Sequence, residues 1–386
     1  MLFNRNTGAN TLLACLAVCG MPIATAAGPI QSQDAAIQQA IQQTVQAYGI
    51  PGMAVGLTVN GTQHFYSTGM AAKENARAVD ADTLFEIGSI SKTLTATLAA
   101  YAEAQGKLSF DASPAKYLVQ LQGKPISQIT VRDLATHTAG YFPLQFPDQV
   151  NTSAQVMTYF QEWKPKYPPG TYRSYANPSV GLLALLAAKS YGKPFAAAME
   201  GDLLPALGLT STFVHVPADQ MQRYAWGYDK EGNAVRVSAG ALSDEAYGVK
   251  SSARDMLHFV AAQLGQVPLP EPLVQALERT REGHFQLGEM TQDMIWEQYP
   301  ASAPLSTLEK GNGYDVIYNS HAVQKIDPPL PPQHNVWVNK TGGTSGFGTY
   351  VAFVPAKHWG VVILANKNYP NEARVRLAHE LFRLLE

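Results

Sequence analysis

Apolar positions recur every three to four residues near both ends of the folded chain. In the segment DAAIQQAIQQTVQAYG, residues 34–49, the apolar side chains share one face and Gly49 follows as a stop signal. The segment NEARVRLAHELFRLLE, residues 371–386, has the same spacing. These patterns predict one amphipathic helix close to each end of the chain.

Strand-like patterns lie just inside these two helices. The runs GMAVGLTVNG and TQHFYSTGMA, residues 52–71, predict two strands, and Asn60-Gly61 between them is a strong hairpin signal. Residues 336–367 predict three more strands, joined by a Gly-rich turn and a Pro-Ala-Lys turn. Strand signals also occur at residues 236–240 and 247–251. Short turns between successive strands imply an antiparallel sheet.

The middle of the chain is mostly helical in pattern. A helix that Gly106 closes has its apolar face formed by Ile90, Leu94, Leu98 and Tyr101. Residues 107–228 alternate helical segments with Pro-rich loops. The polar, Pro-rich residues 300–335 predict a mobile surface loop.

Strands at both ends with helices between them predict an α+β fold of two regions. We expect an antiparallel sheet flanked by N- and C-terminal helices, with an inserted all-helical domain. The expected division is a signal peptide at 1–26, an α/β domain built from 27–106 and 229–386, and a helical domain at 107–228. A site at the junction of the two domains would fit the usual location of pockets.

The first residues have the pattern of a secretory signal peptide. Arg5 precedes an apolar stretch at 12–23, and the small-residue pattern Ala-Thr-Ala follows at 24–26. The stretch is too short for a membrane span. We therefore expect cleavage near residue 26 or 27, a periplasmic protein and no membrane anchor in the mature form. Both cysteines, Cys15 and Cys19, lie in this segment, so the mature chain would have neither disulfide nor thiol chemistry.

Composition and spacing exclude several kinds of function. A chain of 386 residues with 46% hydrophobic residues can bury a large core. The net charge is −2 and no basic stripe is visible, which argues against nucleic-acid binding. The nine histidines lack zinc-site spacing, and we expect His137 and His215 to be structural. The sequence has no Gly-x-Ser-x-Gly motif, which argues against an α/β-hydrolase, and no Gly-rich phosphate loop before a helix. We expect no metal and no cofactor.

The segment GSISK, residues 88–92, contains a candidate nucleophile. Ser89 precedes Lys92 by three residues, so both side chains would lie on one face of a helix. A lysine held neutral by burial or by other cations can take the proton of a serine hydroxyl. The plainer alternative is that Ser89 caps the helix and Lys92 is solvated.

Two later segments offer groups that could complete such a site. Tyr175 and Asn177 precede a helix with Pro178 at its start, where Asn177 could be an ordinary N-cap and Tyr175 a buried aromatic residue. Residues 340–342, Lys-Thr-Gly, end a strand and Gly343 follows. The glycines would let the backbone approach another group closely, or form a simple turn.

The order of the three motifs is more specific than any of them alone. Ser-x-x-Lys, a central motif ending in Asn, and Lys-Thr-Gly form the triplet of β-lactamases and penicillin-binding proteins. Here the central motif is Tyr-Ala-Asn. The chain resembles a class C serine β-lactamase, a cephalosporinase, over essentially its whole mature length. The segments that carry the likeness are FEIGSISKT, DLATHTAG, PLQFPD, YANPS, YAWGYDKEGNAV, EAYGVKS, VNKTGGTSGFGTYVAFVP and LANKNYPNEARV.

The resemblance implies a serine β-lactamase fold, an acyl-enzyme mechanism and a role for individual residues. It also implies an Ω-loop at about 204–251 and a loop under the leaving group at about 314–325. Gly343 departs from the Ser or Ala of many relatives, which should spare its backbone amide. The roles implied are Ser89 as nucleophile, Lys92 and Tyr175 as the proton-transfer pair, Lys340 and Thr341 beside Tyr175 and the substrate carboxylate, Asn177 and Gln145 on the substrate amide, the amides of Ser89 and Gly343 as oxyanion hole, Tyr247 as an aromatic wall, and Asn371 and Arg374 as outer carboxylate-recognition residues.

Three functions share these residues. The first is a β-lactamase that hydrolyses cephalosporins and penicillins and gives antibiotic resistance. The second is a D-Ala-D-Ala peptidase or an esterase, and the third is a penicillin sensor that stays acylated. We expect a monomer with a small-molecule β-lactam substrate. Whether Tyr175 is ionised or Lys92 is neutral stays open at this point, because the two titrations are coupled.

Overall fold

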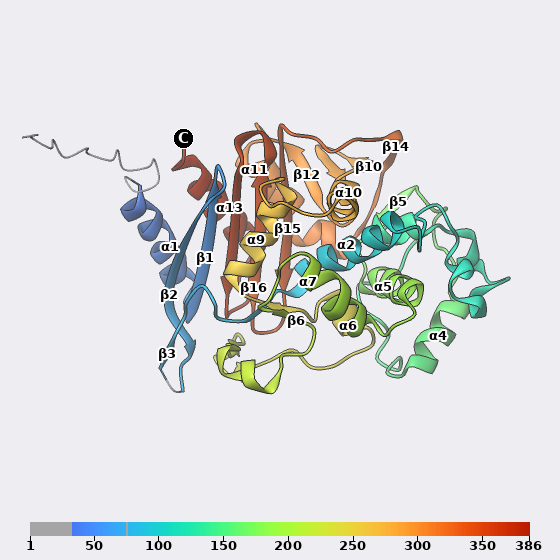
Figure 1. Cartoon of the computed structure of the whole chain (residues 1–386), viewed down its shortest axis with the longest axis horizontal. Coiled ribbons are helices and arrows are strands. Elements are labelled where there is room, and N and C mark those ends of the chain that lie inside the picture. The colour runs from blue at the N-terminus through green and yellow to red at the C-terminus, as the bar shows by residue number, and fades with distance from the viewer. Residues whose placement is uncertain (1–32, 75) are drawn as a thin grey trace, which may run out of the picture.

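The computed structural model of the protein describes residues 33–74 and 76–386. The predicted signal peptide lies outside these residues. Within them the main element is a ten-stranded antiparallel sheet, ordered β14-β10-β11-β12-β15-β16-β17-β1-β2-β3 (Figure 1). Its strands are β1 Gly52–Val59, β2 Thr62–Ala72, β3 Arg77–Ala78, β10 Gly283–Leu287, β11 Met290–Gln292, β12 Glu297–Pro300, β14 Gln324–Leu330, β15 Val336–Gly343, β16 Gly348–Val354 and β17 Trp359–Ala365.

The strand pairs predicted from sequence are present in this sheet. Asn60 and Gly61 both have positive φ, 50° and 83°, which is the backbone of the tight turn expected between β1 and β2. The three late strands β15, β16 and β17 pair in sequence order. β17 then pairs with β1, so the two ends of the chain complete one sheet.

Helices cover both faces of the sheet. Helices α1 (Asp34–Tyr48) and α13 (Asn371–Arg383) pack in one core with the β1 side chains of Met53 and Val55. Helix α9 (Ala253–Gln263) packs against the opposite face. Side chains alternate across a strand, so one short segment supplies both cores. The predicted terminal helices are thus confirmed, and α1 ends at a left-handed Gly49 as expected.

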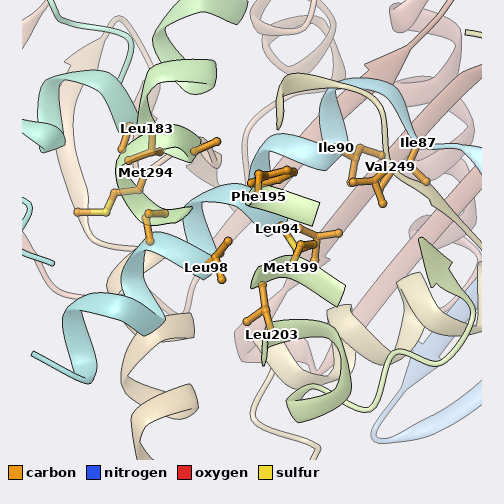
Figure 2. Packing of buried hydrophobic residues seen from close by; sticks show 14 of the residues in the cluster. Ile87, Ile90, Leu94, Leu98, Leu183, Phe195, Met199, Leu203, Val249 and Met294 are labelled. Atoms are coloured by element: carbon orange, nitrogen blue, oxygen red, sulfur yellow. The ribbon is translucent and has the colours of Figure 1, made fainter. Parts of the chain in front are cut away.

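Helix α2 (Ser91–Ala104) lies at the centre of the mainly helical region beside the sheet and is buried almost all round. Its predicted apolar face packs against α5 (Asn177–Tyr191) and the helical turns that follow it (Figure 2). The residues drawn there include Ile90, Leu94 and Leu98 with Leu183, Phe195, Met199 and Leu203. The other helices of this region are α3 Val131–Ala135, α4 Ser153–Glu162, α6 Phe195–Ala198 and α7 Leu204–Ala206. The domain boundaries at 107 and 228 stay a prediction.

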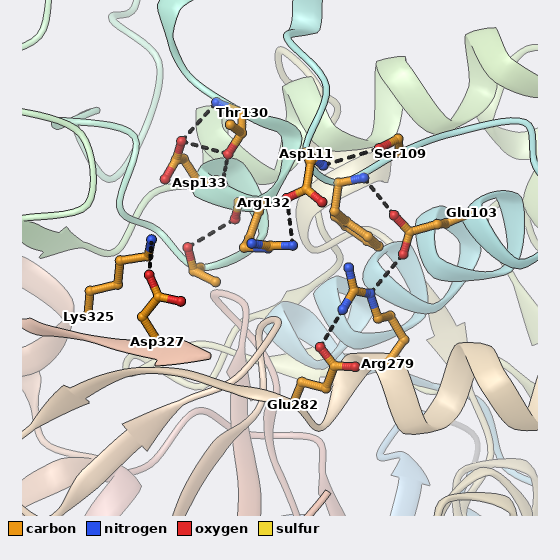
Figure 3. A network of polar contacts seen from close by, with 12 residues as sticks. Glu103, Ser109, Asp111, Thr130, Arg132, Asp133, Arg279, Glu282, Lys325 and Asp327 are labelled. Atoms are coloured by element: carbon orange, nitrogen blue, oxygen red, sulfur yellow. Dashed lines mark hydrogen bonds and ion pairs between the residues drawn. The ribbon is translucent and has the colours of Figure 1, made fainter. Parts of the chain in front are cut away.

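A polar network joins α2 to the helix beside the sheet (Figure 3). Arg279 of α10 (Glu271–Thr280) donates from Nε to Glu103 of α2 at 2.8 Å and also pairs with Glu282. The other oxygen of Glu103 accepts the backbone N–H of Phe110 at 2.7 Å. The network therefore fixes α2, the helix that carries Lys92, relative to the sheet.

The prediction of a mobile loop at residues 300–335 is wrong. This segment forms α11 (Leu305–Gly311), α12 (Tyr314–Tyr318), β13 (Ser320–Ala322) and β14. β13 pairs with β5 (Tyr172–Ser174), immediately before Tyr175. The prediction took the prolines as evidence for a loop. They are tolerated in β14 because it is an edge strand, and one side of an edge strand makes no hydrogen bonds to a neighbouring strand.

The strands predicted at residues 236–240 and 247–251 are largely absent as well. The described chain has no strand at residues 236–240, and only β9 (Lys250–Ser251) forms within 247–251. The amide of Val237 donates to a glutamate side chain in place of a neighbouring strand. Strands β10, β11 and β12 were not predicted. The remaining short elements are β4 Phe85–Glu86, β6 Thr212–Phe213, β7 Gly227–Tyr228, β8 Ala234–Val235 and α8 Ser243–Ala246.

Of the helices that the structure describes, none combines the length and apolar character needed to cross a membrane.

Candidate active site

A cavity of about 410 Å³ lies where the end of β15 meets the start of α2 and α5. It contains nine of the eleven residues predicted for the site, and the other two, Lys92 and Lys340, are buried around it. Its lining is Ser89, Leu144, Gln145, Tyr175, Asn177, Arg236, Val237, Ser238, Tyr247, Tyr314, Ile317, Tyr318, Thr341, Gly342, Gly343, Thr344, Ser345, Asn368, Asn371 and Arg374.

Ser89 lies in a 3-10 turn, Gly88–Ile90, just before α2. Lys92 is fully buried and donates from Nζ to Ser89 Oγ at 2.9 Å and to the carbonyl of Ala246 at 2.9 Å. The N-cap of α2 is Ile90, so Ser89 does not cap the helix. Both plain alternatives, a capping serine and a solvated lysine, are therefore wrong.

The pKa of Lys92 is lowered to about 8. Burial is the largest cause, since it disfavours the ammonium form. The positive charge of Lys340 acts in the same direction, and Tyr175 opposes both. A lysine in this environment can exist as a neutral amine at accessible pH and accept a proton from Ser89.

Tyr175 lies between the two lysines. Its ring centroid is 5.2 Å from Lys92 Nζ and 4.9 Å from Lys340 Nζ. Burial alone would raise the pKa of Tyr175, but Lys340 and Lys92 outweigh it and lower the pKa to about 8. The nearby Ser89 contributes to this shift, although the buried Tyr175 hydroxyl makes no hydrogen bond of normal geometry with any described residue. The phenol is thus a candidate base with an unused oxygen.

Glycines let the turn that carries Ser89 touch the end of β15. Gly88 has a φ of +54°, and a Cβ atom there would lie 2.3 Å from the Gly343 amide nitrogen. A Cβ atom on Gly342 would lie 2.1 Å from the carbonyl oxygen of Ile87. The close backbone approach expected of this Gly pair is therefore present, through Gly342. Gly343 itself has room, since the nearest neighbours of a Cβ atom there would be Asn368 and the carbonyl oxygen of Phe347, both at 3.5 Å.

Asn177 is the first residue of α5 and does not cap it. The N-cap is Ala176, and no side chain caps the helix. The Asn177 Oδ1 atom is buried with no hydrogen-bond partner among the described residues, although the residue lines the cavity. Its backbone N–H donates to the carbonyl of Leu144 at 2.9 Å, which places exposed Gln145 beside it. Two residues with amide side chains, Gln145 and Asn177, thus line the cavity close to each other in the backbone.

Lys340 and Thr341 are both buried at the end of β15. Lys340 Nζ donates to the carbonyl of Thr341 at 3.2 Å. Half-buried Tyr247, which also lines the cavity, follows α8 directly. Asn371 is buried at the start of α13 and donates from Nδ2 to the Asn312 carbonyl at 3.0 Å.

Arg374 is 1% exposed and its guanidinium is already occupied by protein acceptors. It donates to the carbonyl of Gly342 at 2.5 Å, to Asn368 Oδ1 at 2.5 Å and to the carbonyl of Tyr369. Arg374 therefore holds the end of β15 in place through the carbonyl of Gly342, and it also lines the cavity.

Several lining residues were not predicted individually. Tyr314 falls in the predicted 314–325 loop, and its exposed ring lies 5.9 Å from that of Tyr318. Most of the other unpredicted lining residues lie in or next to the segments that resemble the family. A residue-by-residue comparison along those segments would have found these residues. They are Leu144, Arg236, Val237, Ser238, Ile317, Tyr318, Gly342, Thr344, Ser345 and Asn368.

The two histidines considered from sequence have different surroundings. His137 is buried with its ring centroid 4.5 Å from that of Tyr175, and burial holds its pKa well below the usual value. It accepts the backbone N–H of Ala176 at 3.3 Å, so it supports Tyr175 from behind. His215 is exposed and pairs with Asp244 at 3.5 Å. Within residues 33–74 and 76–386, no three His, Cys, Asp or Glu side chains gather as a metal site would require.

Known proteins resemble this chain over nearly its whole length. The sequence pattern of the β-lactamase family matches residues 37–386. A β-lactamase of Lysobacter lactamgenus is 48% identical over 348 residues, which is 90% of each chain. A β-lactamase of Escherichia coli K12 is 39% identical over 373 residues, covering 96% of this chain and 98% of that one.

Solved structures give the same result for the fold. A class C β-lactamase in complex with cefoxitin is 45% identical, with a TM-score of 0.89 and coverage of 92% of this chain and 99% of that one. A β-lactamase/D-alanine carboxypeptidase from Pseudomonas syringae has a TM-score of 0.90 at 48% identity, over 91% and 99% of the two chains. The expected serine β-lactamase fold is confirmed. The chain belongs to the class C group of the β-lactamase family of serine hydrolases.

Proposed function

We propose that this chain hydrolyses the β-lactam amide of cephalosporins and penicillins through an ester on Ser89. The observation that carries the proposal is the contact of 2.9 Å between Lys92 Nζ and Ser89 Oγ, beside a tyrosine that two lysines make acidic. A serine hydroxyl is a weak nucleophile unless an adjacent group takes its proton. Burial and Lys340 favour the neutral amine of Lys92, and both lysines favour the phenolate of Tyr175.

Acylation follows from these positions. Ser89 Oγ attacks the lactam carbonyl while its proton passes to the Lys92–Tyr175 pair. The oxyanion is stabilised by the amides of Ser89 and Gly343, which the contact between Gly88 and the Gly343 backbone brings to the same end of the cavity. The C–N bond then breaks, and the ring nitrogen receives the proton that the pair holds.

Hydrolysis of the ester uses the same pair a second time. A water molecule gives one proton to Tyr175 as its oxygen attacks the ester carbonyl, and Ser89 recovers a proton when the acid leaves. The unpartnered Tyr175 hydroxyl supports this role, because its oxygen is not committed to another residue in the described chain.

The remaining predicted residues are assigned by where they line the cavity. We assign Asn177 and Gln145 to the substrate amide, since both line the cavity and the Asn177 backbone bonds to Leu144, next to Gln145. Thr341 and Asn371 receive the carboxylate from the cavity lining, Lys340 acts on it and on Tyr175 from the buried position next to Thr341, and Tyr247 is the aromatic wall. Arg374 acts through Gly342 and Asn368 rather than by a direct bond, because these groups and Tyr369 already use its guanidinium.

A chromogenic cephalosporin tests this function against its alternatives. The purified protein should open the lactam with many turnovers, and intact mass should show a transient adduct. A stable adduct with a single turnover would indicate a penicillin sensor. Faster cleavage of a diacylated D-Ala-D-Ala peptide would indicate a peptidase, the activity that the name of the Pseudomonas syringae relative includes.

Location and assembly complete the proposal. The signal-like first residues support export to the periplasm, where the chain would act as a monomer and give resistance to β-lactams. Fractionation of expressing cells and size-exclusion chromatography of the mature protein test these two points.

A further inference from the structure

A buried glutamate joins two segments of the chain that line the cavity. Glu86 lies in β4, three residues before Ser89, and is 1% exposed. Its carboxylate accepts three hydrogen bonds, from the Tyr224 hydroxyl at 2.5 Å, the Val237 amide at 2.7 Å and the Thr344 hydroxyl at 2.6 Å. These donors come from segments that lie more than a hundred residues from Glu86 in the sequence, so the carboxylate is a tertiary junction.

Two of the three donors belong to segments that line the active-site cavity. Residues 236–238 and 343–345 all line the cavity, and the second set consists of the last residue of β15 and the first two residues of the turn after it. Val237 and Thr344 lie outside the described strands, so no ladder bonds hold either residue in place. Thr344 is otherwise held by two hydrogen bonds: its backbone N–H donates to the carbonyl of Phe347 at 3.0 Å, and Asn368 Nδ2 donates to its carbonyl at 2.8 Å.

The third donor supports the 236–238 segment from behind. Tyr224 does not line the cavity, but its ring lies 3.8 Å from the guanidinium carbon of Arg236. Arg236 also donates to the Tyr224 carbonyl at 2.7 Å. The hydroxyl of Tyr224 can therefore be removed without touching the cavity or the stacked ring.

We propose that Glu86 is a positioning residue for the reaction at Ser89. It fixes the separation of the 236–238 segment from the 343–345 segment and thereby aims the amide of Gly343 at the reacting carbonyl. The inference rests on the proposed acyl-enzyme function. Without the carboxylate, two half-buried donors from two segments of the cavity lining lose a common acceptor. Small misplacements near a reacting centre can reduce rates by about 100-fold.

The geometry predicts that hydrogen bonding matters here more than charge. In Glu86→Gln, the amide oxygen can accept from both Tyr224 and Val237, as Oε1 does now. The amide NH₂ group can donate to the Thr344 hydroxyl, which is able to accept as well as donate. Glu86→Gln should therefore retain the junction, whereas Glu86→Ala removes it.

The test compares kcat and KM for a chromogenic cephalosporin across five variants, with melting temperature measured for each. We expect Glu86→Ala to lower kcat by about 10- to 100-fold and to raise KM, and Glu86→Gln to stay within about threefold of wild type. Thr344→Val should lower kcat by about tenfold, while Thr344→Ser, which keeps the hydroxyl, should not. Tyr224→Phe should reduce the melting temperature with little change in kcat.

These comparisons separate positioning from stability alone. If kcat in all five variants follows melting temperature, or if Thr344→Val matches Thr344→Ser, Glu86 is only structural and the proposal is wrong. A Glu86→Gln variant as impaired as Glu86→Ala would also overturn it, because the negative charge would then be the cause. An inactive wild type would count against the β-lactamase function instead.

Discussion

Gly88 and Gly343 lie so close that a single methyl group could not fit on Gly88. Its Cβ atom would lie 2.3 Å from the Gly343 amide nitrogen and 2.8 Å from the Gly343 carbonyl carbon. Gly88 also has a φ of +54°, which side-chain-bearing residues rarely adopt. The contact is asymmetric, because a Cβ atom on Gly343 would meet Asn368 and the carbonyl oxygen of Phe347 at 3.5 Å, an ordinary van der Waals distance.

This asymmetry gives a matched pair of variants. Gly88→Ala should lower kcat/KM by at least about 100-fold, because the displaced backbone carries both proposed oxyanion donors. Gly343→Ala should stay within about threefold of wild type, since only its amide is used. Steady-state kinetics on a cephalosporin, with circular dichroism as a folding control, checks both. Equal effects of the two substitutions would contradict the asymmetry.

Local rules predicted the parts of the fold that local rules control. The Asn60-Gly61 turn has a backbone that few other residue pairs adopt, so it could be recognised from two letters. The terminal helices were predicted because their apolar spacing matches the face they bury. Helix α2 was predicted from Ile90, Leu94 and Leu98, which do lie in the core, although the rest of the helix is buried too. β14 could not be predicted, because whether a Pro-containing strand is acceptable depends on its place at the sheet edge.

The site shows the same division. The three motifs named Ser89, Lys92, Tyr175 and Lys340 correctly as neighbours, because the family resemblance supplied the tertiary contacts that spacing alone does not. The contacts of Arg374 with main-chain carbonyls, and those of Glu86 with Val237 and Thr344, were missed. Both are buried charges whose partners are distant in sequence, and no local pattern encodes such partners.

Replacing the nucleophile should remove all covalent chemistry. In Ser89→Ala the Oγ atom that Lys92 contacts at 2.9 Å is absent, so no ester can form. We expect turnover at background level and no mass adduct with a slowly hydrolysed β-lactam. Intact-mass spectrometry is the measurement, and cefoxitin, bound by the class C relative, is a suitable probe. An adduct on the alanine variant would show that another residue is acylated.

Removing the charge of Lys340 should move the pH profile. A cation lowers the pKa of a nearby phenol and of a nearby ammonium, so Lys340→Met should raise the pKa of both Tyr175 and Lys92. Below those pKa values the pair keeps its proton and cannot accept the one from Ser89. The acid limb of kcat/KM should therefore shift upward, by about one pH unit.

The control for this shift is Lys340→Arg, which keeps the positive charge. Its acid limb should stay near that of wild type, even if its maximal rate falls because the substrate is held differently. A kcat/KM profile from pH 5 to 10 is needed for all three proteins. A limb that stays in place in Lys340→Met would show that Lys340 does not tune the base.

Tyr175→Phe tests the base itself. The change removes only the hydroxyl oxygen, which is buried without a hydrogen-bond partner in the described chain, so the folded structure should lose little stability. The ring stays beside Lys92 and Lys340. We expect kcat to fall by at least about 100-fold, the scale of lost general acid–base catalysis.

Both chemical steps should slow in Tyr175→Phe, because the same oxygen is proposed to relay protons in acylation and in water attack. Stopped-flow acylation and the decay of the adduct by intact mass measure the two steps separately. A loss confined to the decay would leave Lys92 as the base for acylation, since its Nζ already contacts Ser89 Oγ. Two rates near those of wild type would make Tyr175 only a wall of the cavity and contradict the proposed relay.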